Sequence, residues 1–161
     1  MPANCHFPGS HLKHLLLALV LGTLLMVDAA AADICGYPAK GNLVVTRNGQ
    51  VVATFRVGLA ENPSQHRQGL MGCQNLDSGT GLLFIYPDAR RRTFWMKDTP
   101  LELAILFASS NGRIEAIEEG HPFSTHHIQS PDGIQFVLEI QLANVDDIRV
   151  GDRMTLRLVP E

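Results

Sequence analysis

One short segment of this 161-residue chain carries an aromatic side chain, a cation and an anion close together. Trp95, Lys97 and Asp98 stand where an apolar run ends in a polar turn. Alternate side chains of a strand share a face, so Trp95 and Lys97 should lie together, with Met96 opposite. An indole ring beside an ammonium group forms a pocket wall that suits a small anionic or sugar-like ligand. Arg67, on a short predicted helix, is the expected second cation of this site.

The same segment also has a purely structural interpretation. Trp95 and Met96 would then belong to the core, and Lys97 would pair with Asp98 or Glu102. The sequence leaves both interpretations open.

Two neighbouring carboxylates offer a second kind of chemistry. Glu118 and Glu119 follow an apolar run and, with Asp98, would bring acidic groups together if the fold placed them side by side. Paired carboxyl groups support acid–base hydrolysis when their surroundings separate their pKa values. Solvated surface charge is the simpler explanation of the same residues.

Other motifs with recognisable chemistry are weak. His121, His126 and His127 occur in a long loop, but adjacent histidines on an extended chain do not easily bind one ion. The sequence shows no phosphate-binding or dinucleotide fingerprint. We therefore expect neither a metal nor a cofactor.

The beginning of the chain predicts export. Residues 15–27 carry no charge, Lys13 precedes them, and Ala30 and Ala32 give a small-residue cleavage site. These features are typical of a secretory signal peptide over residues 1–32, and place the processed protein in the periplasm or outside the cell. The run is shorter than the ~20 residues of a membrane span, so an uncleaved anchor is the weaker alternative and no span is expected after processing.

Cleavage there would leave an even number of cysteines. Cys5 leaves with the leader, and Cys35 and Cys73 remain. In an oxidising compartment this favours a disulfide, although two separated free thiols are the alternative. The net charge of −3 gives no basic face for nucleic acid, and Arg90, Arg91 and Arg92 are interpreted as a solvated turn.

The positioning elements are predominantly strands. Residues 33–42 read as an irregular lead-in to one β-rich domain over residues 43–161. A hairpin is predicted around Asn48-Gly49, and a helix over residues 63–68 between Asn62 and Gly69. Residues 119–133 form the longest loop. The predicted fold is mainly β: a small antiparallel or mixed β-barrel or sandwich with one or two short helices. Further strands are predicted at residues 81–85, 93–96, 101–107, 113–118, 134–141 and 154–159, and a helical turn at 143–148.

A set of short motifs in a fixed order resembles a known family. The motifs are Arg67-Gln68-Gly69-Leu70-Met71-Gly72, Gly81-Leu82-Leu83-Phe84, Phe94-Trp95-Met96-Lys97-Asp98-Thr99, Val137-Leu138-Glu139 and Val150-Gly151-Asp152. They resemble the domain of unknown function 192 family, which implies a small β-rich domain, often behind a signal peptide, with no established activity. This chain departs from the family pattern at Asp98, where asparagine is usual, and at Cys73, where arginine is common. An ionised aspartate only accepts hydrogen bonds, so Asp98 lacks the donor that an asparagine amide would offer a ligand.

The sequence thus favours an exported binding or accessory module whose site surrounds Arg67, Trp95, Lys97 and Asp98. Its partner would be a small anionic or sugar-like ligand, or an envelope protein. An envelope hydrolase or lyase that uses Asp98, Glu118 or Glu119 is the alternative, and a purely structural protein is the third.

Overall fold

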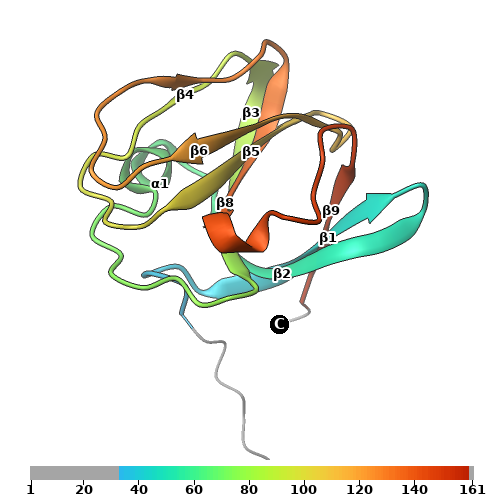
Figure 1. The fold of residues 1–161 in the computed structure, drawn as a ribbon, viewed down its shortest axis with the longest axis horizontal. Coiled ribbons are helices and arrows are strands. Elements are labelled where there is room, and N and C mark those ends of the chain that lie inside the picture. Colours follow the sequence, from blue (N-terminus) through green and yellow to red (C-terminus); the bar gives the residue numbers. More distant parts are fainter. Residues whose placement is uncertain (1–32, 160–161) are drawn as a thin grey trace, which may run out of the picture.

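The computed structural model describes residues 33–159. Within that range the chain is mainly β, as predicted, with one short α-helix and one turn of 3-10 helix (Figure 1). In chain order the elements are β1 (Ala39–Arg47), β2 (Gln50–Ala60), α1 (Pro63–Gln68), β3 (Thr80–Arg90), β4 (Thr93–Phe94), β5 (Leu103–Ser109), β6 (Ile114–Gly120), β7 (Ile128–Gln129), β8 (Ile134–Gln141), η1 (Leu142–Asn144) and β9 (Arg153–Leu158).

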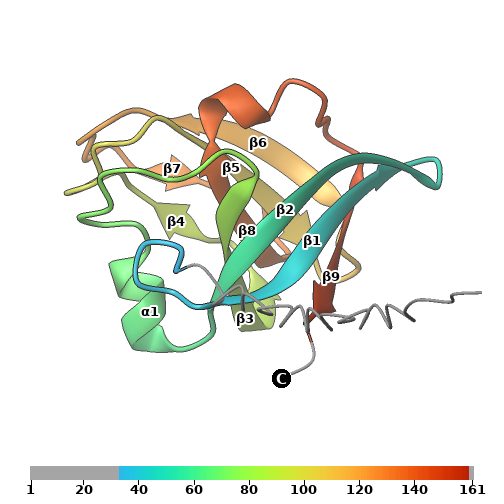
Figure 2. The same cartoon turned by 90° about the horizontal axis from the view of Figure 1, so that it is seen from below.

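Seven of these strands form one mixed sheet in the order β6-β5-β8-β3-β2-β1-β9. The β2–β3 pair is parallel, and α1 lies in the connection between these two strands. The sheet curls strongly without closing into a barrel (Figure 2). Its two edges approach each other where Arg113 and Arg153 form an isolated bridge. The short strands β4 and β7 pair separately and lie over one face of the large sheet.

Local sequence signals account for the first hairpin. Asn48 and Gly49 both have positive φ, 51° and 80°, as a two-residue hairpin turn requires. The predicted lead-in over residues 33–42 is wrong at its end, because β1 already begins at Ala39. Gly41 pairs there with both neighbouring strands, and a β-carbon on it would lie 2.7 Å from a backbone oxygen of Arg157. The missing side chain lets β9 pack against β1.

The large sheet is buried on both faces. In β5, Leu103, Ile105 and Phe107 face one core, whereas Ala104 and Leu106 face the other. The second core fills the inside of the curl between β1, β2, β9 and the central strands. The first core lies between β3, β5, β8 and a cover of α1, β4 and loops, and it contains Phe84, Phe94, Met96, Ile105, Phe107 and Val137. The candidate site is on this side of the sheet.

The predicted disulfide is present. Cys35 and Cys73 are bonded across 38 residues, with their Cα atoms 5.4 Å apart. The bond fastens the segment before β1 to the loop that follows α1. Closing a loop of this length in the unfolded chain is worth ~4 kcal/mol.

The expected leader, residues 1–32, lies outside the described residues. Within residues 33–159 no helix combines the length and the hydropathy that crossing a bilayer requires.

Candidate functional site

The short helix α1 forms one side of the candidate site, and its bounds match the prediction. Asn62 caps it by accepting hydrogen bonds from the backbone N–H groups of Ser64 and Gln65, and the Gln65 side chain bonds back to the Asn62 N–H. This reciprocal capping box, with Pro63 in the first turn, explains why so short a segment is helical. Gly69 ends the helix at φ 48°, in the left-handed region.

His66 attaches α1 to the sheet, a role that sequence reasoning missed. Its Nε2 lies 3.0 Å from the carbonyl oxygen of Ala60 and 3.1 Å from that of Ile85. Both partners are acceptors, so Nε2 carries the proton. The ring also packs on Tyr86, with 4.2 Å between ring centroids. These contacts fix the helix over the end of β2 and the middle of β3.

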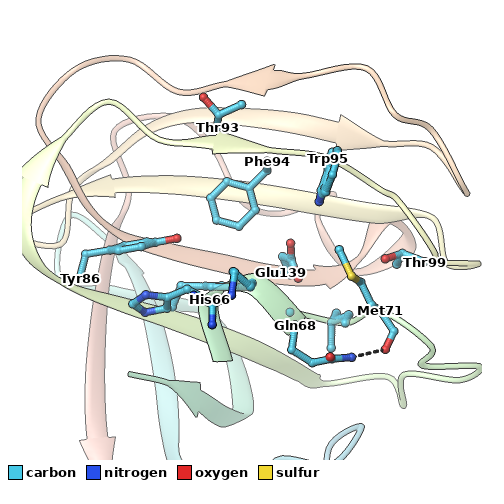
Figure 3. Close-up of a pocket in the computed structure, with 13 residues that line it drawn as sticks. His66, Gln68, Met71, Tyr86, Thr93, Phe94, Trp95, Thr99 and Glu139 are labelled. Atoms are coloured by element: carbon cyan, nitrogen blue, oxygen red, sulfur yellow. Dashed lines mark hydrogen bonds between the residues drawn. The ribbon is translucent and has the colours of Figure 1, made fainter. Parts of the chain in front are cut away.

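A cavity of about 300 Å³ lies between α1, β3, β8 and the β4 segment (Figure 3). Such a volume is at the small end of the range for ligand pockets. Aromatic side chains contribute much of its wall. Its lining residues include Phe84, Tyr86, Phe94, Trp95, Arg67 and Glu139.

Glu139 is the most unusual residue of this pocket. Its neighbours across the sheet on β3 and β5 are Leu82 and Ile105, so its carboxyl group emerges on the face of the first apolar core. The residue is 4% exposed, and within residues 33–159 its Oε2 is the buried side-chain polar atom that lacks a hydrogen-bond partner. Burial raises its pKa to about 8, so the carboxyl group holds a proton at neutral pH.

The sequence contains a signal for Glu139. It interrupts the apolar residues of the 134–141 strand, and it closes the motif Val137-Leu138-Glu139 that contributed to the family resemblance. A glutamate is almost never fully buried unless it is paired. Its presence inside such a strand could have been interpreted as a functional group rather than an exposed one.

The structure brings together two of the four predicted ligand-binding residues. Arg67 and Trp95 both border the pocket, and Trp95 is 43% exposed at its edge. Lys97 and Asp98 are exposed, pair with each other, and do not line it. Met96 is buried, as the alternation of the segment predicts, and its sulfur packs against Gly120.

Asp98 has a conformational role instead. Its φ is 54°, in the left-handed region that asparagine and aspartate tolerate better than other residues with a β-carbon. Its carbonyl oxygen accepts a hydrogen bond of 2.8 Å from Gly72 N–H, which ties the segment after β4 to the loop after α1. The backbone conformation thus explains why asparagine and aspartate suit this position, with no need for a ligand contact.

The predicted carboxylate pair does not converge. Glu118 and Glu119 are consecutive residues of β6, paired with Ile105 and Ala104, and therefore point to opposite faces of the sheet. Both are exposed, and neither lines the pocket. Glu118 lies in the same cross-strand row as Glu139, two strands away, which is roughly 10 Å between backbones.

The arginine cluster is not a solvated turn throughout, contrary to the prediction. Arg90 and Arg91 are exposed, but Arg92 is 6% exposed. Its guanidinium carbon lies 3.8 Å from the centre of the Tyr86 ring, and its Nε donates to the carbonyl oxygen of Ile134. A bond to Asp88 completes the arrangement, and it holds the pKa of that carboxyl group below its usual range. Arg92 therefore supports the pocket wall from behind.

The long loop contains structure that the sequence did not show. Residues 128–129 form β7, which pairs with β4 and so holds the segment that leads to Trp95. His121, His126 and His127 belong to no group of three metal-ligating side chains, and the residues described contain no such group.

Comparisons with known proteins agree with this fold. A protein from Sinorhizobium meliloti, provisionally described as a transcription regulator, is 33% identical, with a TM-score of 0.70 over 78% of this chain and 98% of its own. A protein of unknown function from Novosphingobium aromaticivorans is 27% identical, with a TM-score of 0.66 over 71% of this chain and 83% of its own. No curated protein matches. The model of the uncharacterised ACR family DUF192 matches residues 43–156, and the chain belongs to that family.

Proposed function

We propose that this protein is an exported binding module that holds a small ligand in the pocket between α1 and the β4 segment. The observation that carries the proposal is the buried, unpartnered Oε2 of Glu139 facing an aromatic-lined cavity. A buried polar atom without a partner costs about 1–3 kcal/mol, so a fold retains one where it serves a purpose. A ligand that bonds this atom would recover that cost.

The pocket border supplies the remaining recognition groups. Arg67 is exposed at the mouth, where its guanidinium would bind a carboxylate or phosphate of the ligand. Trp95 offers an apolar face at the same edge. Lys97 and Asp98 lie beyond the pocket as an exposed pair and would add little binding energy.

Export is supported by the predicted leader together with the disulfide. Disulfides such as Cys35–Cys73 are typical of oxidising compartments and rare in the cytosol. We do not propose DNA binding on the description of the Sinorhizobium meliloti protein. The net charge is −3, and Arg92, one of three consecutive arginines, is buried within the fold.

The chain offers a direct test, because Trp95 is its single tryptophan. Tryptophan fluorescence of the purified protein would be titrated with a panel of sugars, sugar phosphates, carboxylates and amino acids. We expect at least one compound to change the Trp95 signal, and Arg67→Ala and Glu139→Gln each to weaken its binding by roughly tenfold or more. Arg157→Ala is the matched control, since Arg157 is exposed on the far strand β9. The proposal would be refuted if the compounds that bind did so with the same affinity to the wild-type protein and to both pocket variants.

A further inference from the structure

We propose that the ligand of this pocket carries a primary or secondary amine that bonds the Glu139 carboxylate, and an anionic group that Arg67 binds at the mouth. The inference rests on the proposed function and specifies the chemical class of the ligand: a small zwitterion of the amino-acid type. It differs from the expectation based on Trp95 and Lys97, which considered only anionic or sugar-like ligands.

The surroundings of Glu139 lack a hydrogen-bond donor for Oε2 and a positive charge for the ionised carboxylate. The cross-strand neighbours of Glu139, Leu82 and Ile105, are apolar. A carboxylate in that position is stable only with a cation beside it, and an ammonium group supplies both the charge and the N–H donor that Oε2 lacks. A quaternary ammonium would supply charge alone and leave Oε2 without a hydrogen bond.

Three polar groups near Glu139 bond to other partners. The Tyr37 hydroxyl donates to backbone oxygens of α1 and its end, at Gln65 and Gly69. His66 Nε2 donates to the carbonyl oxygens of β2 and β3 already described. Arg92 faces the Tyr86 ring and bonds Asp88.

The two tyrosines stay neutral at neutral pH, so neither places a charge beside Glu139. Burial raises the pKa of Tyr86 to about 12, and burial followed by the charge of Glu139 raises that of Tyr37. Among the residues that line the pocket, Arg67 is the single lysine or arginine, and it lies at the mouth. The ligand is thus the natural source of the second positive charge.

The aromatic walls favour the same chemistry. Phe84 and Phe94 meet edge to face, with 5.0 Å between ring centroids, and Trp95 and Tyr86 extend the wall around Glu139 (Figure 3). Aromatic faces attract a desolvated cation electrostatically. A ligand with only a carboxylate would offer these aromatic faces no cation to attract.

Gly69 keeps the carboxyl group accessible. A β-carbon there would lie 3.4 Å from Cζ of Phe84 and 4.0 Å from Oε2 of Glu139. The positive φ of 48° also disfavours any other residue at this position. The end of α1 therefore reaches the pocket floor as bare backbone, and a longer side chain would cover Glu139.

The experiment compares ligands that differ in one charge. Trp95 fluorescence would be titrated with the ω-amino acids from glycine to 6-aminohexanoate, because chain length then reports the span from Glu139 to Arg67. Each is matched with the fatty acid and the alkylamine of equal length. We expect one amino acid length to bind best, its alkylamine roughly tenfold weaker, and its fatty acid weaker still by roughly 10–100-fold.

Substitutions assign the two ends of the ligand. Glu139→Gln should weaken the amino acid and the alkylamine by roughly 10–100-fold. Arg67→Gln should remove the advantage of the amino acid over the alkylamine and leave alkylamine binding unchanged. Glu118→Gln, an exposed glutamate in the same cross-strand row, is the matched control and should change neither. Circular dichroism melting checks that each variant is folded.

Proton release gives an independent readout. Glu139 must lose its proton to bind an ammonium group, so affinity should rise about tenfold per pH unit from pH 5 to 7 and level off near pH 8. Affinity that falls over this range would contradict the inference.

The outcomes separate the two proposals. Fatty acids or neutral sugars that bind with Glu139-dependent affinity, while amines do not, would overturn the amine assignment and leave the binding pocket in place. If the amines and the rest of the panel all fail to alter Trp95 fluorescence in the folded protein, both proposals are overturned.

Discussion

The buried Glu139 makes a strong prediction about stability and pH. In the unfolded chain its pKa is 4.5, and in the folded protein burial raises it to about 8. Between these values the folded state binds one proton more than the unfolded state, so the free energy of unfolding falls as pH rises. The interval is about 3.5 pH units, and at ~1.36 kcal/mol per unit the total loss is ~5 kcal/mol.

Glu139→Gln removes the titration and keeps the size of the side chain. Near pH 4.5 the variant and the wild-type protein should have similar free energies of unfolding, because the wild-type carboxyl group is then neutral when folded. As pH rises toward 8, the wild-type protein should lose ~1.4 kcal/mol per unit relative to the variant. This loss of unfolding free energy is absent below the pKa that Glu139 has in the unfolded chain, and complete above the pKa that it has in the folded protein.

Urea denaturation at half-unit pH intervals measures this difference, with circular dichroism and Trp95 fluorescence as two probes of unfolding. Glu118→Gln is the control, since Glu118 is exposed and its removal should leave the pH dependence unchanged. If the wild-type protein and Glu139→Gln show parallel curves from pH 4.5 to 8, Glu139 is not a buried neutral acid. The proton-release argument for the ligand would fail with it.

Three further predictions follow from other parts of the molecule. Replacing both Cys35 and Cys73 with serine should lower the free energy of unfolding by ~4 kcal/mol, and a matching fall on reduction of the wild-type protein would exclude a side-chain effect. Asp98→Asn should change the free energy of unfolding, measured by urea denaturation, by less than ~0.5 kcal/mol. Asp98→Ala should lower it by ~1 kcal/mol, because alanine tolerates the φ of 54° at this position less well. Equal effects of the two substitutions would contradict the conformational role of Asp98. Intact-mass measurement of the exported protein should give a chain beginning at Asp33, and a retained leader would show that the signal peptide assignment is wrong.

The sequence by itself predicted features that depend on nearest neighbours or on composition. Asn62 and Gly69 bound α1 correctly because capping involves groups within one helical turn. Asn48 and Gly49 identified the first hairpin for the same reason. The Cys35–Cys73 bond was expected because the predicted cleavage leaves two cysteines in an oxidising compartment, and that argument uses composition alone.

The tertiary structure decided which side chains meet. Strand alternation puts Glu139 on the same face as Val137. Whether that face is exposed to solvent depends on α1 and β4, which come from distant parts of the chain. Arg92 is buried and its neighbour Arg91 is exposed because only Arg92 reaches Tyr86, six residues earlier in the sequence but opposite it in the fold. The residue type decides only which titratable group a side chain carries. Whether that group meets water depends on the elements that cover it. Glu139 is covered and becomes a candidate binding group, whereas Lys97 and Asp98 remain exposed at the surface.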